Sequence, residues 1–179
     1  MRQLTAPELN RLSPLDFKNS EKLPVSLLLE NVRSMHNVGS IFRTADAFCL
    51  STIYLTGITG SPPHREIHRS ALGAEDTVSW EHHQDPLAFD KQLKQKGHVL
   101  VAVEMTNESV GLDQWTWAFG QPLTLILGNE VEGVSPEMLQ LCVGSVHIPQ
   151  GGTKHSLNVS VCGGVVAWEL YRRWKKKGG

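Results

Sequence analysis

Residues 25–31 read VSLLLEN, a short and continuously apolar run that ends in two polar residues. Such a run is typical of a strand that is buried on both faces, and strands of this kind belong to parallel sheets covered by helices. Residues 37–49, NVGSIFRTADAFC, have apolar side chains at a 3.6-residue period. This period predicts a helix that Asn37 begins and that carries Arg43. A buried strand followed by a helix indicates an α/β fold.

The same alternation of apolar strands and helices continues along the chain. Further strands are expected at 51–57, 98–105, 122–128 and 145–150. Further helices are expected at 85–97, from Ser135 onward and at 156–174. Residues 58–69, rich in Gly, Pro and His, have no period and are expected to form a long functional loop. The pattern predicts an α/β protein with a Rossmann-like, mainly parallel sheet and helices on both faces.

The length and composition indicate a single globular domain. The chain has 179 residues, of which 40% are hydrophobic and 20% charged. Thr5 and Glu8 form a capping-box-like pattern, which predicts a short helical extension over 1–24 before the main domain at 25–179. No segment has the length of a membrane span or the apolar run of a signal peptide, so a cytoplasmic protein is expected. The three cysteines have the spacing of neither a disulfide framework nor a zinc knuckle.

Positive charge is concentrated towards the two ends of the chain. The formal net charge is −1 and the pI is about 6.7, which alone gives no support to nucleic-acid binding. No Lys or Arg occurs between Lys96 and Lys154, whereas six carboxylates do. The C-terminal basic run consists of Arg172, Arg173, Lys175, Lys176 and Lys177. It has two interpretations, a binding site for phosphates or the solvated end of a helix.

Polar residues gather where the predicted strands end. The first group follows the strand at 25–31 and includes Arg43, six residues after Asn37. An arginine in this place offers a planar, bidentate donor for a phosphate, and a surface arginine without a role is the alternative interpretation. Ligands of parallel sheets bind beyond the carboxyl ends of strands. We therefore expect this group to converge with two others that also follow strands.

The second group is GNEVEGV, residues 128–134. Gly128 and Gly133 let the backbone approach a ligand closely, and Glu130 can accept hydrogen bonds from amino or hydroxyl groups. A tight turn is the alternative interpretation. The sequence is neither a G-x-G-x-x-G fingerprint nor a P-loop, so neither of these nucleotide-binding motifs is present here.

The third group lies in IPQGGTKHSLNVSV, residues 148–161. Ile148 and Leu157 can bracket an apolar or aromatic ligand, while Ser156 and Asn158 present polar groups around the start of the last predicted helix. Ser156 has a second interpretation as the N-cap of that helix. The group therefore combines features of a binding site with those of a helix start.

Together, the three groups resemble motifs 1, 2 and 3 of the SpoU/TrmH branch of the SPOUT methyltransferases. N-x-G-x-I-x-R-T-A, G-N-E-x-x-G-V and I-P-x-x-G-x-x-x-S-L-N-V-S-V occur in this order within residues 37–161, and the resemblance extends from Val25 to Trp168. It implies the SPOUT fold, in which the C-terminal part of the sheet forms a deep trefoil knot that holds S-adenosyl-L-methionine (AdoMet). It also implies methyl transfer to a ribose 2′-hydroxyl of structured RNA.

The resemblance assigns roles to individual residues. Its catalytic positions match Arg43, Asn37, Glu130, Ser156 and Asn158. Its cofactor-binding positions match Glu104, Leu127, Gly128, Asn129, Ile148, Gln150 and Leu157. Arg43 has the key role, either as a transiently deprotonated base or as a clamp on an RNA phosphate, and the clamp is favoured because a guanidinium holds its proton strongly. Asn158 and Ser156 would orient Arg43 and the ribose, and Glu130 would order the surrounding loop.

The resemblance also implies partners. Family members are typically homodimers, and the last helix leaves Gly163, Val166 and Leu170 to be covered. The expected substrate is tRNA, with rRNA as an alternative, and a non-catalytic RNA-binding protein on the same fold is a further alternative. A nicotinamide enzyme would need a glycine fingerprint after the first strand, where this chain has ENVRSMHNVGS.

Histidines raise a metal site as an alternative chemistry, although we expect no metal. The candidates are His64, His68, His82 and His83. No cysteine lies near them in the sequence and no helix is predicted there. His155 is either a helper at the site or a solvent-facing loop residue. Trp115 and Trp117 are expected to cover the core or a dimer surface rather than to stack on bases.

Overall fold

The described part of the chain forms a seven-stranded parallel sheet with helices on both faces. The computed structural model describes residues 1–5 and 7–178. The strands lie in the order β3-β2-β1-β6-β4-β7-β5, and every pairing between neighbouring strands is parallel. The prediction of an α/β fold with a mainly parallel sheet is confirmed.

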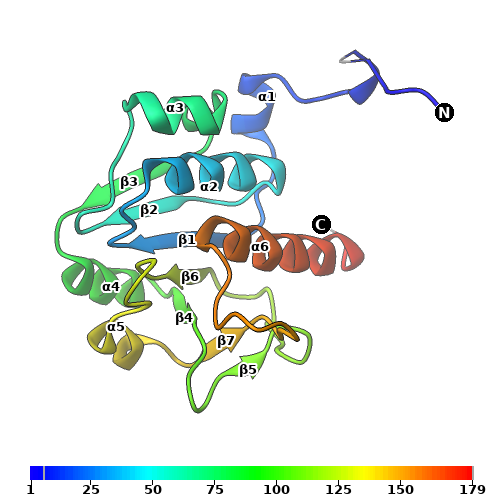
Figure 1. The fold of residues 1–179 in the computed structure, drawn as a ribbon. Helices are drawn as coiled ribbons and strands as arrows, with labels where there is room; N and C mark the ends of the chain where they lie inside the picture. Colours follow the sequence, from blue (N-terminus) through cyan, green and yellow to red (C-terminus); the bar gives the residue numbers. More distant parts are fainter. Residues whose placement is uncertain (6, 179) are drawn as a thin grey trace.

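The elements follow the predicted alternation. The strands are β1 Val25–Glu30, β2 Ile53–Thr56, β3 Trp80–His83, β4 Val99–Val103, β5 Val110–Gly111, β6 Leu123–Leu127 and β7 Ser145–His147. The α-helices are α1 Pro14–Asn19, α2 Met35–Ala47, α3 Arg65–Ala71, α4 Pro86–Gln95, α5 Pro136–Leu141 and α6 Val159–Lys176. Short 3₁₀ helices occupy Pro7–Leu9 (η1) and Ala74–Asp76 (η2). Figure 1 shows that β1, β2 and β3 point the same way and that α2 begins at their carboxyl edge.

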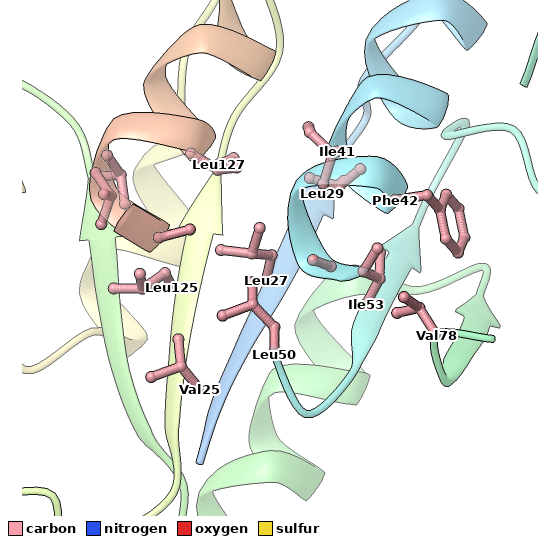
Figure 2. Packing of buried hydrophobic residues seen from close by; sticks show 14 of the residues in the cluster. Val25, Leu27, Leu29, Ile41, Phe42, Leu50, Ile53, Val78, Leu125 and Leu127 are labelled. Atoms are coloured by element: carbon pink, nitrogen blue, oxygen red, sulfur yellow. The ribbon is translucent and has the colours of Figure 1, made fainter. Parts of the chain in front are cut away.

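Alternate strand residues point into two separate hydrophobic cores, which explains why apolar residues occupy consecutive positions in β1, β4 and β6. In β1, Leu27 and Leu29 pack in the core under α2 and α6, whereas Leu28 faces the core under α4 and α5. Figure 2 shows the first core, where side chains of β1 and β6 lie close to Ile41 of α2. All six residues of β1 are buried. Each buried leucine contributes about 1.5–3 kcal/mol, so β1 anchors both layers.

Two glycines let three helices share one layer. Gly163 of α6 faces the sheet, and a Cβ there would lie 3.1 Å from Cδ1 of Leu127. Gly39 of α2 faces α3, and a Cβ there would collide with the carbonyl oxygen of Ile67. Helix α2 is therefore held between α3 on one side and α6 on the other, with its first turn at the carboxyl edge of the sheet.

Several element boundaries differ from the prediction. Ser34 caps α2, since its hydroxyl accepts a hydrogen bond from the backbone N–H of Asn37 (3.3 Å), and Asn37 lies inside the first turn. Part of the predicted loop at 58–69 is helix α3, whose cap is His64. Strands β3 and β5 escape the sequence pattern because both lie at sheet edges and are short, without continuous burial.

The extension before β1 contains little helix. The predicted capping-box contact is present, because Glu8 accepts a hydrogen bond from the backbone N–H of Thr5 (2.7 Å), but only η1 follows. The α-helix of this region is α1, which Ser13 caps and which Phe17 anchors to the core under α2. The extension is therefore attached to the main domain through Phe17 and through Leu23, which is fully buried and forms a backbone bridge with Leu50.

The basic C-terminal run divides into two parts: its lysines are exposed at the end of α6, as the interpretation of a solvated helix end has it, whereas its two arginines are bound within the protein. Arg172 and Arg173 both donate hydrogen bonds to the carboxylate of Glu169. Arg173 also donates to two backbone carbonyls in the loop at 112–119, and Lys177 lies over an aromatic ring of the same loop. The hydrogen bond from Arg172 is the largest cause that lowers the pKa of Glu169 to about 2. The run ties the last helix to this loop.

The remaining structural expectations concern aromatic residues, membranes, metals and thiols. Trp115 and Trp117 pack against the core, as expected. Among the described residues, no helix has the length and apolar character needed to cross a membrane. Within residues 1–5 and 7–178, no three His, Cys, Asp or Glu side chains are grouped as metal ligands. Cys49, Cys142 and Cys162 are free thiols. The trefoil knot stays a prediction.

Candidate active site

Three segments that follow β1, β6 and β7 meet at the carboxyl edge of the sheet. Asn37, in the first turn of α2, donates a hydrogen bond from Nδ2 to Oε1 of Glu130 (3.1 Å). The Nδ2 of Asn158 in turn donates to Oδ1 of Asn37 (3.2 Å). These bonds join residues that are 93 and 121 positions apart in the sequence. The expected convergence of the three polar groups is therefore present in the structure.

The carboxylate of Glu130 fixes the start of α2. Besides the amide of Asn37, it accepts hydrogen bonds from the backbone N–H groups of Arg33 and Ser34, both at 3.2 Å. Burial pushes the pKa of Glu130 upward, but these hydrogen bonds outweigh burial and leave the pKa below its ordinary value. A negative charge at a helix N-terminus is also favoured by the helix dipole. The ionised carboxylate therefore connects the loop after β6 to α2.

Asn158 caps α6 and binds α2 at the same time. Its Oδ1 accepts a hydrogen bond from the backbone N–H of Ser160 (2.9 Å), while its Nδ2 reaches Asn37. The alternative interpretation of Ser156 as the N-cap is wrong. Ser156 is exposed and forms no side-chain hydrogen bond with the described residues. Its hydroxyl is therefore available to a ligand.

The glycine-bounded loop at 128–134 closes on itself. Asn129 and Gly133 exchange two backbone hydrogen bonds (3.0 and 2.9 Å), and a Cβ on Gly128 would collide with the backbone of Gly133. Gly133 has a φ of +71°, in the left-handed region that favours glycine. Gly128 and Gly133 therefore serve the tight turn of the loop. The space beside Gly128 is filled by the loop's own backbone and is not open to a ligand.

Two side chains tie this loop to neighbouring strands. Asn129 donates a hydrogen bond to the backbone carbonyl of Asn31, just after β1 (2.8 Å). Glu104, just after β4, accepts one from the backbone N–H of Val134 (3.1 Å). The loop is held at both ends, so the position of Glu130 relative to α2 does not depend on Glu130 alone.

An open cavity of about 620 Å³ lies among these segments. Its walls include all the residues that the resemblance assigns to the cofactor, namely Glu104, Leu127, Gly128, Asn129, Ile148, Gln150 and Leu157. Glu130, Ser156 and Asn158 line it as well. The volume falls in the range of about 300–1,000 Å³ that small-molecule sites occupy. The structure thus brings the predicted cofactor positions around one space.

Arg43 stands apart from this cavity. It lies on the exposed face of α2, is not among the lining residues, and forms no hydrogen bond or ion pair with the part of the chain that the structure describes. The expected contact of Asn158 or Ser156 with Arg43 is absent from the described residues, because Asn158 binds Asn37 instead. The guanidinium is therefore free to meet a partner from outside.

Sequence reasoning missed two residues that shape the loop before α2. Asn31 has a φ of +55°, and its side chain accepts a hydrogen bond from the backbone N–H of Ile58 (3.1 Å). Thr59 donates to the carbonyl of Leu29 (3.0 Å) and accepts from the backbone N–H of Val32 (2.9 Å). An Asn at a strand end is a recognisable signal for a left-handed residue. Thr59 has no such signal, since its partners lie 27 and 30 positions away.

The fold and the site define a class of protein. A parallel sheet with an open cavity beyond the carboxyl ends of its strands is typical of α/β proteins that bind nucleotide-like ligands. Residues 24–168 match the family described as SpoU rRNA Methylase. The chain belongs to this family, and the resemblance drawn from the three motifs is confirmed.

The relatives agree with this assignment. A tRNA (guanosine(18)-2′-O)-methyltransferase of Aquifex aeolicus is 31% identical over 171 residues, which cover 95% of this chain and 78% of that protein. The crystal structure of the A. aeolicus TrmH/SpoU tRNA modifying enzyme matches with a TM-score of 0.80 and 27% identity, covering 92% of this chain and 84% of that one. An AdoMet-bound rRNA methyltransferase from Sinorhizobium meliloti matches with a TM-score of 0.79 and 28% identity, covering 91% of this chain and 61% of that one.

Proposed function

We propose that the protein is an AdoMet-dependent methyltransferase that modifies a ribose 2′-hydroxyl of tRNA in the cytoplasm. The observation that carries the proposal is the hydrogen-bonded network of Asn37, Glu130 and Asn158, which joins the three family motifs beside the cavity. The relative from A. aeolicus supports tRNA as the substrate. In this proposal the catalytic domain spans 25–179, and 1–24 is a short extension.

AdoMet suits the cavity in size and in chemistry. Leu127, Ile148 and Leu157 offer apolar surface for the adenine, and Gln150 and backbone groups of the lining offer polar partners. Binding is expected to need no metal. When bound, AdoMet supplies an activated methyl group on a positively charged sulfonium.

Arg43 acts as a clamp on an RNA phosphate. Its exposure and its lack of a partner within the described residues support this role, because a free guanidinium can bind a phosphate with two parallel hydrogen bonds. Holding the ribose in line with the methyl donor can lower the barrier by several kcal/mol. Ser156 orients the ribose from the cavity wall, and the Asn37–Glu130–Asn158 network keeps the starts of α2 and α6 together.

The active form is a homodimer. The sequence predicts that a partner covers three positions of α6. These positions are instead buried in the protein's own core, so this detail of the prediction is wrong: Gly163, Val166 and Leu170. A different set of apolar side chains on α6 is exposed: Val161, Val165 and Trp168. They are four and three residues apart and therefore form one stripe on the helix. An exposed apolar stripe that starts beside the cavity supports an interface through α6.

rRNA is the second candidate substrate, because the S. meliloti structure named above is an rRNA methyltransferase. A purely RNA-binding role on the same fold is the remaining alternative. The presence of Arg43, Ser156 and Asn158 together with an open cavity speaks against it.

The test is methyl transfer from labelled AdoMet to unmodified tRNA transcripts and, separately, to rRNA fragments. We expect faster incorporation into tRNA. Faster incorporation into rRNA would replace the substrate and leave the chemistry intact. Tight AdoMet binding without transfer to either RNA would contradict the proposal and favour a binding protein.

A further inference from the structure

One long stretch of the chain carries carboxylates without any Lys or Arg, whereas α2 and α3 carry arginines as well as the carboxylates Asp46 and Glu66. Six carboxylates and no Lys or Arg occur between Lys96 and Lys154, the stretch that contains β4 to β7 and much of the cavity wall. RNA phosphates are repelled by such a surface. This charge distribution favours an approach of the RNA over a surface that also offers cations.

The basic C-terminal run is not a good counterpart for phosphates. Arg172 and Arg173 are bound to Glu169, and Arg173 also binds the loop at 112–119. Lys177 lies 5.0 Å from the centre of the Phe119 ring. Binding a phosphate would require most of this run to give up contacts that it already makes.

Helix α3 presents two unengaged arginines. Ile67 and Ala71 are its buried residues, and Gly39 of α2 packs against its backbone. Arg65 and Arg69 lie on the opposite side of the helix, one turn apart, and both are exposed. Neither forms a hydrogen bond or ion pair with the residues that the structure describes.

The exposed face of α2 continues this surface. α3 lies next to α2 on the same side of the sheet (Figure 1). His36, Ser40, Arg43 and Ala47 follow one another along α2 at helical spacing and point away from the core. The outer surface of the two helices thus carries three guanidiniums without partners among the described residues, those of Arg43, Arg65 and Arg69.

We propose that Arg65 and Arg69 bind the phosphate backbone of the RNA substrate, next to the nucleotide that Arg43 clamps. The inference rests on the proposed function and names the surface over which the RNA enters. Two arginines one helical turn apart are separated by about 6 Å along the axis, which lets them bind separate phosphates of one strand. Glu66, the carboxylate of α3, lies in its first turn, where the helix dipole stabilises it.

The experiment compares the double variant Arg65→Gln/Arg69→Gln with the matched control Lys91→Gln/Lys96→Gln. The control removes the same charge from α4 and its C-cap residue Lys96, and the buried apolar residues of α4 belong to the core on the other face of the sheet. The affinity for an unmodified tRNA transcript is measured at several salt concentrations. For the arginine variant we expect at least about fivefold weaker binding, and a slope of log affinity against log salt reduced by about 1.4–1.8, or about 0.7–0.9 per lost phosphate contact.

Kinetics provide a second readout. The arginine variant should raise KM for tRNA by a larger factor than it lowers kcat, with unchanged AdoMet affinity as the check of folding. If that check fails, the single variants Arg65→Gln and Arg69→Gln replace the double variant, and each should reduce the salt slope by about 0.7–0.9. If the arginine variant had the same salt slope and the same KM as the Lys91→Gln/Lys96→Gln control, the inference would be overturned. Absence of methyl transfer by the wild type would instead overturn the proposed function, while the binding slope would still test the surface.

Discussion

The side chain of Asn37 is hydrogen-bonded to the carboxylate of Glu130, with 3.1 Å between Nδ2 and Oε1. The same carboxylate accepts the backbone N–H groups of Arg33 and Ser34, so one ionised side chain holds three donors of the segment that begins α2. Because Asn37 also binds Asn158 at the start of α6, Glu130 influences the position of α2 relative to α6, the helix whose first turn lines the cavity.

Replacing Glu130 should damage catalysis through this network. Glu130→Gln keeps the size of the side chain but leaves one carbonyl oxygen to meet three donors. We expect methyl transfer to fall roughly 10- to 100-fold, since small displacements of positioning groups have effects of this size. Single-turnover rates measure it, with Glu137→Gln on α5, outside the cavity, as the control. An unchanged rate would show that loop order does not depend on this charge.

Arg43→Lys should abolish the transfer step and spare the cofactor. Lysine keeps the charge but loses the planar pair of donors, so we expect a loss of about a hundredfold or more in methyl transfer. AdoMet affinity, titrated in the presence of EDTA, should remain nearly unchanged, because Arg43 is not among the residues that line the cavity. If the variant kept most of its activity, the clamp would be wrong even within the right family.

Asp90 makes stability depend on pH. It is 0% exposed, and neither carboxylate oxygen has a hydrogen-bond partner among the described residues. The pKa of Asp90 is raised to about 7, mainly by burial and secondarily by the nearby carboxylate of Glu30. Because this pKa is higher than that of Asp90 in the unfolded chain, the folded protein binds the proton more tightly than the unfolded chain does. The protonated carboxyl therefore adds to the free energy of unfolding at low pH, and this contribution is lost as the pH rises towards 7.

Asp90→Asn should remove this dependence. The wild type is expected to lose up to about 1.4 kcal/mol of unfolding free energy per pH unit between about pH 4 and pH 7 through this one group. Urea unfolding of both proteins at acidic and at mildly alkaline pH, at one protein concentration, measures the difference. The variant should gain stability relative to the wild type as the pH rises. Parallel pH profiles for the two proteins would mean that Asp90 is not protonated in the fold.

The stripe on α6 predicts the oligomeric state. Trp168 is 50% exposed and Val161 51% exposed, so a charge introduced between them would enter the proposed interface. Val165→Glu should convert a dimer to a monomer at micromolar concentration in sedimentation experiments. Val143→Glu, at another exposed apolar residue outside α6, should leave the dimer intact. A wild-type monomer with full methyl-transfer activity would remove the dimer from the account.

The sheet and the site motifs were predictable because their signals are local. The run at 25–31 is apolar at every position from Val25 to Leu29 apart from one serine, and the period of α2 is clear over 13 residues. The pattern places the start of α2 at Asn37, whereas Ser34 is the cap in the structure. Both residue types are good caps, and only the hydrogen bond that the Ser34 hydroxyl accepts distinguishes them.

Other features depend on distant partners and have no local signal. The contact of Asn158 with Asn37 spans 121 positions, and that of Arg173 with the loop at 112–119 spans about 60. The sequence pattern could therefore place Asn158 near the site without showing what it binds. It also could not show that the two arginines of the basic run are bound to partners within the protein, because free and bound arginines give the same charge pattern.

The transferred methyl group is expected on a ribose oxygen of tRNA. The direct measurement is mass spectrometry of nucleosides from tRNA that has been incubated with the protein and deuterium-labelled AdoMet. We expect the label to stay with the ribose when the base is cleaved from the sugar in the spectrometer. With Arg43→Lys we expect no label on the tRNA. A label that leaves with the base would show that the protein methylates a base and not a ribose.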